Sequence, residues 1–280
     1  MIRLGTSSWQ FEGWQEVFYP EKLPKDQQLP YYAKQFDTVE VNTSFYGLPR
    51  ATTLVKWIQS TPAGFQFCLK APRAITHDKR LQNAQEETKQ FLEVLRSLGE
   101  AAAPAFLQFP PDFSRQMNGK VLATYLDWLA GELHGIRMGV EVRAKDLTTA
   151  PFAAFLAERG FCLVLVDRVD TADQYETWYS LLTEQKVPNF AIVRWIGDDL
   201  KGPKGDREIS APQDERLALW ADRLVALDAA GIEVYGYMHN PYEGHSPASV
   251  RRLKTLLAAQ VPLRAWPPGE PGTLVQATLL

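Results

Sequence analysis

The sequence has little cysteine, no strong excess of charge and no long apolar run. Cys68 and Cys162 are its two cysteines, and each lies in an apolar segment, so we expect buried reduced thiols and a cytoplasmic protein. A formal net charge of −3 argues against a nonspecific binder of long nucleic acid or of anionic membrane. The longest apolar runs, such as residues 161–166, are far shorter than the about 18 residues that a membrane span needs. Residues from 2 onward read as a strand and not as a signal peptide.

Short apolar segments rich in β-branched and aromatic residues alternate with longer segments of helical pattern. We expect strands at 2–9, 38–46, 65–72, 105–110, 137–143, 161–168, 190–197 and 233–240. We expect helices near 30–36, 51–60, 86–98, 120–133, 150–159, 173–186, 213–230 and 247–258, four of them with proline in the first turn. This alternation predicts an α/β fold, a single (βα)8 TIM barrel over residues 1–280, with an irregular tail from about residue 260.

The loops that follow the expected strands are longer than the loops that precede them. The long ones are 10–29, 72–85, 110–119 and 198–212. In a barrel this asymmetry places the working face at the carboxyl ends of the strands. The segment GTSSW, at residues 5–9, carries no G-x-G-x-x-G pattern, so an open dinucleotide-binding sheet is not supported.

Several motifs in one order carry a family resemblance. They are GTSSW, FYP at 18–20, YYAKQFDTVEVNTSFY, FCLKAPRAITH, LQFPP, VEVR and RWIG. With them the chain resembles domain-of-unknown-function family 72, also called YecE-like, from residue 4 to about 197. The resemblance implies a TIM barrel and no established reaction. The chain departs from the family pattern at Trp195–Gly197, where we expect a His-Gly pair, and at Met238–Asn240, where we expect an aromatic residue and two amides.

Two of the expected strands carry glutamates inside apolar segments. Glu40 and Asn42 are two residues apart, as are Glu141 and Arg143, so each pair is expected on one face of its strand. An isolated buried carboxylate is too costly to keep, so it must be paired, protonated or used in chemistry. We expect Glu40 and Glu141 to be the catalytic acid and base, with Asn42 orienting one of them. The alternative is a structural layer of ion pairs.

Cations outnumber anions at the expected strand ends. The cations are Lys70, Arg73, Arg143, Arg168 and Arg194, and the anions are Glu40, Glu141 and Asp167, which leaves +2 on a chain whose total is −3. Guanidinium groups bind phosphates and carboxylates in bidentate fashion, so this contrast predicts a small anionic ligand. We assign Lys70, Arg143 and Arg194 to the ligand, whereas Arg73 and Arg168, each taken alone, are expected to face solvent.

Further candidates lie on the same face. His77 follows the third strand and is a candidate for proton transfer, while His239 and Asn240, at the end of the eighth, are expected to bind substrate. Trp9 and Tyr46 are expected to stack on a sugar or a base.

No cofactor is expected, and a divalent metal is a minor alternative. Its candidate ligands are Glu141, Asp167 and His239, which are carboxylate and imidazole groups at strand ends. No H-x-H or E-x-x-H spacing reinforces this set. Neither the sequence nor the resemblance predicts an oligomeric state.

The sequence leads to three functional hypotheses. The first is an enzyme acting on a small phosphorylated or sugar-containing anionic substrate by carboxylate acid–base chemistry, with hydrolysis the preferred reaction. The second is a nucleic-acid binding or repair protein that grips phosphates with its basic rim and with loop 198–212, which carries Lys201, Lys204 and Arg207. The third is a noncatalytic small-molecule sensor.

Overall fold

The computed structural model describes residues 1–183 and 188–268. All eight expected strand segments are found, and the sixth is divided at Val164 into β6 and β7. The strands are β1 (Ile2–Thr6), β2 (Thr38–Val41), β3 (Gln66–Leu69), β4 (Ala105–Gln108), β5 (Met138–Glu141), β6 (Cys162–Leu163), β7 (Leu165–Arg168), β8 (Phe190–Gly197) and β9 (Glu233–Met238). Most are shorter than the expected segments, because their last polar residues already belong to the following loops.

The helices also lie close to their expected positions. They are α1 (Lys25–Ala33), α2 (Ala51–Gln59), α3 (Gln85–Leu98), α4 (Arg115–Glu132), α5 (Ala150–Ala157), α6 (Tyr175–Thr183), α7 (Asp214–Ala229), α8 (Asn240–Glu243) and α9 (Ser246–Ala258). Pro151 and Pro247 lie in a first turn, as expected. The same expectation was wrong for Pro30, which lies inside α1, and for Pro212, which precedes the N-cap of α7. The short helix α8 was not expected.

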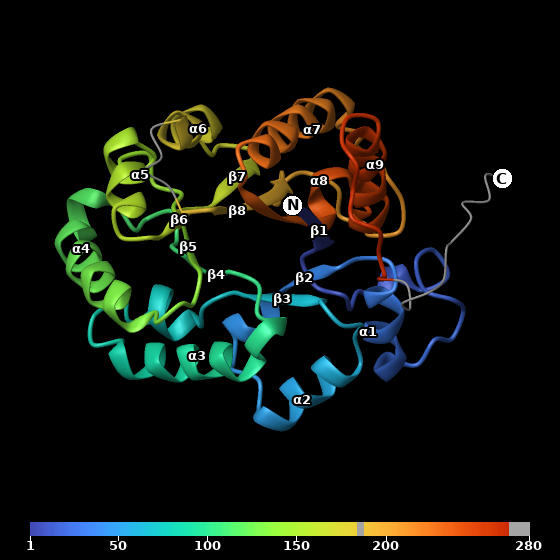
Figure 1. Ribbon diagram of the computed structural model, residues 1–280, viewed down its shortest axis with the longest axis horizontal. Coiled ribbons are helices and arrows are strands. Elements are labelled where there is room, and N and C mark those ends of the chain that lie inside the picture. The colour runs from blue at the N-terminus through green and yellow to red at the C-terminus, as the bar shows by residue number, and fades with distance from the viewer. Residues whose placement is uncertain (184–187, 269–280) are drawn as a thin grey trace.

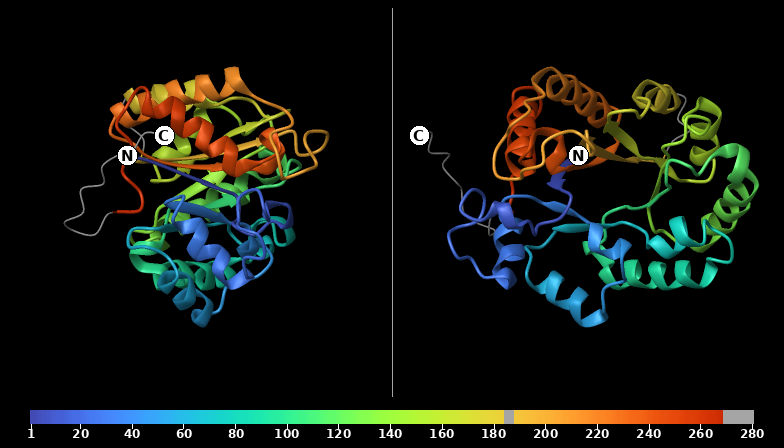
Figure 2. Two further views of the ribbon diagram at one scale, coloured as in Figure 1. Left: turned by 90° about the vertical axis from the view of Figure 1, so that its right-hand side faces the viewer. Right: turned by 180° about the vertical axis from the view of Figure 1, so that it is seen from behind.

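The strands pair in parallel in three sheets. Their orders are β1-β9-β8-β7, β2-β3 and β4-β5-β6. Single bridges join Ser7, directly after β1, to Glu40 of β2, and Lys70, directly after β3, to Phe106 of β4. The fold is therefore α/β with parallel sheets, and residues 1–183 and 188–268 do not form one uninterrupted eight-stranded ladder. Figure 1 and the right-hand view of Figure 2 show the helices around the outside and the strands within.

The strands are buried on both faces, as parallel strands covered by helices must be. Every residue of β2, β4 and β5 is buried, and a cluster that includes Phe106, Ile192 and Tyr237 packs beneath the charged residues described below. Cys68 and Cys162 are free and buried, which confirms the expectation of reduced thiols. Of the long loops expected after the strands, 198–212 carries no strand or helix, and 72–85 contains a π-helical turn and the first residue of α3. The loops expected at 10–29 and 110–119 are shorter, because α1 begins at Lys25 and α4 at Arg115.

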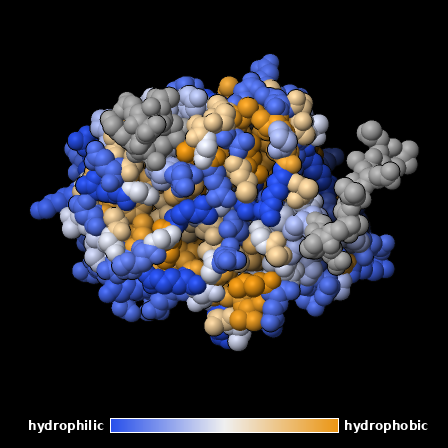
Figure 3. Space-filling model, in the orientation of Figure 1, coloured by the Kyte–Doolittle hydropathy of each residue, from blue (hydrophilic) through white to orange (hydrophobic). Residues whose placement is uncertain are grey.

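The surface in Figure 3 is mostly hydrophilic, with a hydrophobic patch over α2, where Val55 and Ile58 are exposed. Among the described residues, no helix combines the length and the apolar character that crossing a membrane requires. Residues 260–268 form no helix or strand, as expected for the tail, and the remainder of the tail lies outside the described residues.

Candidate functional site

Three charged side chains from separate strands meet in the interior. Glu40 of β2 and Glu141 of β5 are fully buried, and Arg194 of β8 is 2% exposed. Arg194 donates from Nε and Nη2 to the two carboxylate oxygens of Glu40, both at 2.8 Å, and from Nη1 to Glu141. Its guanidinium also lies over the ring of Phe106, 4.8 Å from the centroid. We call Glu40, Arg194 and Glu141 the ionic floor.

Both glutamates of the ionic floor are held in the charged form. Burial alone would raise the pKa of each carboxyl, but the Arg194 guanidinium outweighs it and leaves the pKa of Glu40 and of Glu141 below the ordinary value. Neither group is therefore suited to donate a proton at neutral pH. Because the guanidinium occupies the space between the carboxylates, a scissile bond cannot lie between them. The expectation of Glu40 and Glu141 as an acid and base pair is not supported by this geometry.

Lys70 and Arg143 lie above the ionic floor and are half-buried. Arg143 donates from Nε to Glu141 at 3.1 Å. Lys70 follows β3, and its Nζ lies 4.0 Å from the centroid of the Phe45 ring. Within the described part of the chain, Lys70 forms no ion pair. Burial, followed by the positive charge of Arg194, lowers the pKa of Lys70 to about 8.

His239 borders the same floor. Its Nε2 lies 3.1 Å from Arg194 Nη2 and 3.6 Å from Glu40 Oε2. Since a guanidinium can only donate, Nε2 accepts this hydrogen bond and the ring proton lies on Nδ1. Burial lowers the pKa of His239, so the imidazole is neutral at neutral pH. The backbone N–H of His239 donates to Trp195 O at 2.9 Å, which fixes the residue against β8.

His77 lies in a π-helical turn, Ala74–Asp78, after β3. Its Nδ1 is 2.8 Å from the Thr76 hydroxyl, and its ring meets the ring of Phe45 edge-on at 4.9 Å. Burial and the charge of Lys70 lower the pKa of His77 to about 4. Phe45 therefore contacts both Lys70 and His77. Single-turn π-helices occur often at functional sites.

Asn42 is not placed as the strand pattern predicted. β2 ends at Val41, and a 3-10 turn begins at Asn42, so Asn42 and Glu40 do not share a strand face. Asn42 instead lines a cavity of about 190 Å³ with Ser8, Trp9, Gln10, Val41, Thr43 and Trp57. Trp9 is packed edge-on against Trp57, with centroids 5.4 Å apart. Tyr46 is 82% exposed and borders Phe45.

Two further candidates have structural partners. Asn240 Oδ1 accepts from the backbone N–H and the hydroxyl of Ser246, at 3.0 and 2.7 Å, and so holds the start of α9. Its assignment to substrate binding is not supported. Asp167 accepts hydrogen bonds from Arg216, Trp220 and Tyr242.

The proposed metal set is not brought together. Asp167 is directed to α7 and α8, whereas Glu141 is engaged by Arg194 and Arg143. In residues 1–183 and 188–268, no group of three or more His, Cys, Asp or Glu is arranged to hold a metal ion. Glu141, Asp167 and His239 are therefore not a metal site in this structure.

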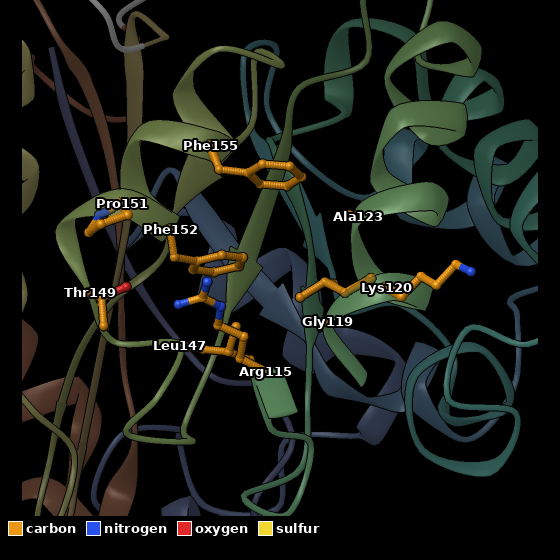
Figure 4. Close-up of a pocket in the computed structure, with 10 residues that line it drawn as sticks. Arg115, Gly119, Lys120, Ala123, Leu147, Thr149, Pro151, Phe152 and Phe155 are labelled. Carbon is orange, nitrogen blue, oxygen red and sulfur yellow. The ribbon is translucent and has the colours of Figure 1, made fainter. Parts of the chain in front are cut away.

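A separate groove of about 410 Å³ lies between α4 and α5. Figure 4 shows Phe152 and Phe155 projecting from α5 toward α4, with the Arg115 guanidinium beside Phe152. The groove shares no residue with the ionic floor or with Lys70 and Arg143. It is lined mainly by apolar side chains and offers no group suited to proton transfer.

Phe45 is the member of the site that the sequence did not single out. It lies in the TSFY segment directly after β2, where it resembled the apolar underside of a loop. The Ser44 hydroxyl lies 2.7 Å from both Val41 O and Lys70 O and shares its proton between these two acceptors, which holds this segment against the end of β3. The signal available in the sequence was an aromatic residue directly after a strand that carries a buried glutamate.

Comparison with known proteins gives a consistent result. The family model described as "Protein of unknown function DUF72" matches residues 3–271. The UPF0759 protein YecE of Escherichia coli (strain K12) is 27% identical over 270 residues, covering 90% of this chain and 91% of its own. The crystal structure of a DUF72 family protein from Thermotoga maritima MSB8 aligns with a TM-score of 0.76 and 25% identity, covering 92% of this chain and 99% of the other.

A more distant likeness concerns the fold alone. The crystal structure of an AP endonuclease, family 2, from Brucella melitensis aligns with a TM-score of 0.57 and 12% identity, covering 91% of this chain and 99% of the other. The overall fold of this chain is thus similar to that of this structure as well.

Proposed function

This chain belongs to the DUF72 family of proteins of unknown function, and from that premise we propose that it is an enzyme acting on a small anionic substrate. The substrate would bind at the carboxyl ends of β2, β3, β5, β8 and β9, above the ionic floor. Phosphorylated and carboxylated compounds, sugars among them, are the substrate classes that fit, and hydrolysis remains the preferred reaction.

One observation carries the proposal, namely that the site has more cations than its own carboxylates can neutralise. Arg194, Arg143 and Lys70 supply three positive charges, and Glu40 and Glu141 supply two negative charges, which leaves +1 in a partly desolvated setting. An anion would satisfy Lys70 and the outward N–H groups of Arg143. Charge-assisted hydrogen bonds of this kind are short and strong.

The proposed division of roles differs from an acid and base pair of glutamates. The ionic floor holds Arg194 and Arg143 in place and fixes the tautomer of His239. Lys70 and Arg143 bind the anion, and the neutral imidazoles of His239 and His77 transfer protons. A cluster of titratable groups with shifted pKa values at strand ends is a candidate active site on physical grounds.

We further propose that the three sheets form one closed (βα)8 ring. The single bridges between β1 and β2 and between β3 and β4 support this arrangement, as does the continuity of β6 and β7 along the chain. Closure would explain how side chains of β2, β5 and β8 converge on one guanidinium. The buried free thiols are consistent with a reducing cytoplasm.

The proposal is tested by titration with inorganic phosphate and with a panel of sugar phosphates and small carboxylates. Lys70→Met and Arg143→Met should each weaken binding about tenfold or more, since a charged hydrogen bond contributes roughly 1.5–3 kcal/mol. Lys145→Met is the matched control, because Lys145 is exposed two residues from Arg143. Binding that neither site variant changes would refute the site. A ligand that binds there and is never converted would indicate the sensor hypothesis.

Nucleic-acid binding is less well supported by the geometry. The AP endonuclease of similar fold acts on nucleic acid by its name, but the likeness extends to the fold alone. In loop 198–212, Lys204 donates to Leu200 O and Arg207 pairs with Glu16, so two of its three cations have partners within the protein. Affinity for DNA or RNA that falls steeply with salt would favour this alternative.

A further inference from the structure

Among the residues that the structure describes, Lys70 differs from the other charged residues of the site in having no carboxylate partner. The charged and titratable groups that face it are Glu40 of β2, Glu141 of β5, Arg143 after β5, Arg194 of β8 and His77 of the π-helical turn. Arg194 is closely engaged by both glutamates, and Arg143 by one of them. Lys70 is therefore half-buried beside two cations, a setting that disfavours a protonated amine, and the contact with the Phe45 ring offsets only part of that effect.

We propose that Lys70 is a nucleophile that forms an imine with the carbonyl carbon of an aldehyde or ketone substrate that also carries a phosphate or carboxylate. This inference rests on the proposed function: Lys70 binds a free anion in its protonated form, and in its neutral form it would react while Arg143 holds the anionic group of the substrate. Lysines activated for this reaction are desolvated or placed next to another cation, and Lys70 meets both conditions. The Phe45 ring under Nζ excludes water from one side of the amine.

The protonation state of Lys70 is consistent with this role. With its pKa lowered to about 8 by burial and by Arg194, roughly a tenth of the amine is neutral at pH 7, compared with about 0.03% for an ordinary lysine. Lys70 is half-buried and not fully enclosed, which leaves part of the residue accessible to a small carbonyl compound. His77, which contacts the same Phe45 ring, is neutral at this pH.

The chemical step balances without any further reactant. The Nζ lone pair forms a C–N bond while the carbonyl π electrons move to oxygen. A neutral imidazole, assigned to His77 because it shares Phe45 with Lys70, carries one proton from nitrogen to oxygen and gives a carbinolamine. The second nitrogen proton then passes to the hydroxyl, which leaves as water as the C=N bond forms.

Reductive trapping tests the inference on the full chain. Glyoxylate, an aldehyde with a carboxylate, is added with cyanoborohydride at pH 7, and the modification of each lysine is followed by peptide mass spectrometry. Lys70 should be modified at least tenfold faster than Lys145, and its rate should rise through pH about 8. Modification of Lys70 at the same rate as Lys145 would overturn the inference.

Two variants distinguish imine formation at Lys70 from anion binding at the same site. Lys70→Arg retains the cation and removes the nucleophile, so it should bind phosphate and lose the fast modification. His77→Gln should slow trapping severalfold and leave the pH midpoint of Lys70 near 8. If wild type binds phosphate but Lys70 is not trapped, the imine is refuted and the anion site stands. If Lys70 is trapped quickly but phosphate does not bind, the anion site is refuted.

Discussion

At the scale of single residues, Arg194 keeps Glu40 and Glu141 in their charged forms. A buried guanidinium with two carboxylates is costly to desolvate, and the ion pairs offset that cost only if every partner is present. The arrangement therefore fixes geometry more than it adds stability. It also explains why Glu40 and Glu141 are poor proton donors. The candidates for reaction are instead Lys70, which has no counter-ion among the described residues, and the neutral imidazole of His239.

The first prediction concerns the cost of breaking the ionic floor. Arg194→Met should lower the free energy of unfolding by about 3–5 kcal/mol, because it leaves two buried carboxylates without their main partner. The triple variant Glu40→Gln, Glu141→Gln, Arg194→Met removes the charges together and should recover part of that loss. Chemical denaturation measures both.

Arg159→Met is the control for this cycle, because Arg159 pairs with Asp127 at the surface and should contribute less than about 1 kcal/mol. If Arg194→Met lowers the free energy of unfolding no more than Arg159→Met does, the ionic floor is not a buried ion cluster.

The second prediction concerns pH. A lysine whose folded pKa is lowered to about 8 lowers stability at pH values where both states are protonated. As pH rises from about 8 to beyond 10.5, the unfolded state binds more protons than the folded state, so this penalty is relieved. Lys70→Met should therefore be more stable than wild type at pH 7, and the difference should shrink across that window. A difference that is constant with pH would show that the Lys70 pKa is not lowered.

At the scale of secondary-structure elements, the contact between β8 and α8 holds His239 in place. Gly197 ends β8 with φ +72°, and a Cβ there would lie 2.6 Å from Tyr242 Cα and 2.7 Å from Pro241 O. Only glycine allows this approach. The strand end, the N-terminus of α8 and the imidazole of His239 are thus held together by backbone packing.

The third prediction follows from this contact. Gly197→Ala should lower the free energy of unfolding by more than about 1 kcal/mol, because alanine is strained at positive φ and meets backbone atoms. It should also shift the imidazole NMR signals of His239, which Gly205→Ala, with no atom within 4 Å of its added Cβ, should not do. Equal effects of the two substitutions would argue against a positioning role for Gly197.

At the scale of the whole molecule, the convergence of distant strands could be predicted but the pairing of their side chains could not. The alternation of apolar segments and helical patterns located all the strands, and the long loops located the site at their carboxyl ends. Strand parity failed at Asn42, because β2 ends one residue earlier and the chain turns. Asp167 looked equivalent to Glu141 in the sequence, yet it is directed to Arg216 and Trp220.

The same reason explains why Arg194 was expected to bind a ligand and was found between two glutamates. Which cation pairs with which carboxylate depends on the stagger of strands that are far apart in the chain, and no local pattern encodes that stagger. The lowered pKa of Lys70 arises from the same pairing. The sequence could therefore predict several residues of the candidate site, while the pairing of their charges required the structure.

The most direct test of the central claim is a crystal structure of the protein soaked with selenate near neutral pH, with the anion located by its anomalous signal. The account predicts selenate bound to Lys70 and Arg143, with Arg194 still joined to Glu40 and Glu141. Selenate that binds only elsewhere, or an Arg194 that leaves Glu40 and Glu141 to bind the anion, would contradict it.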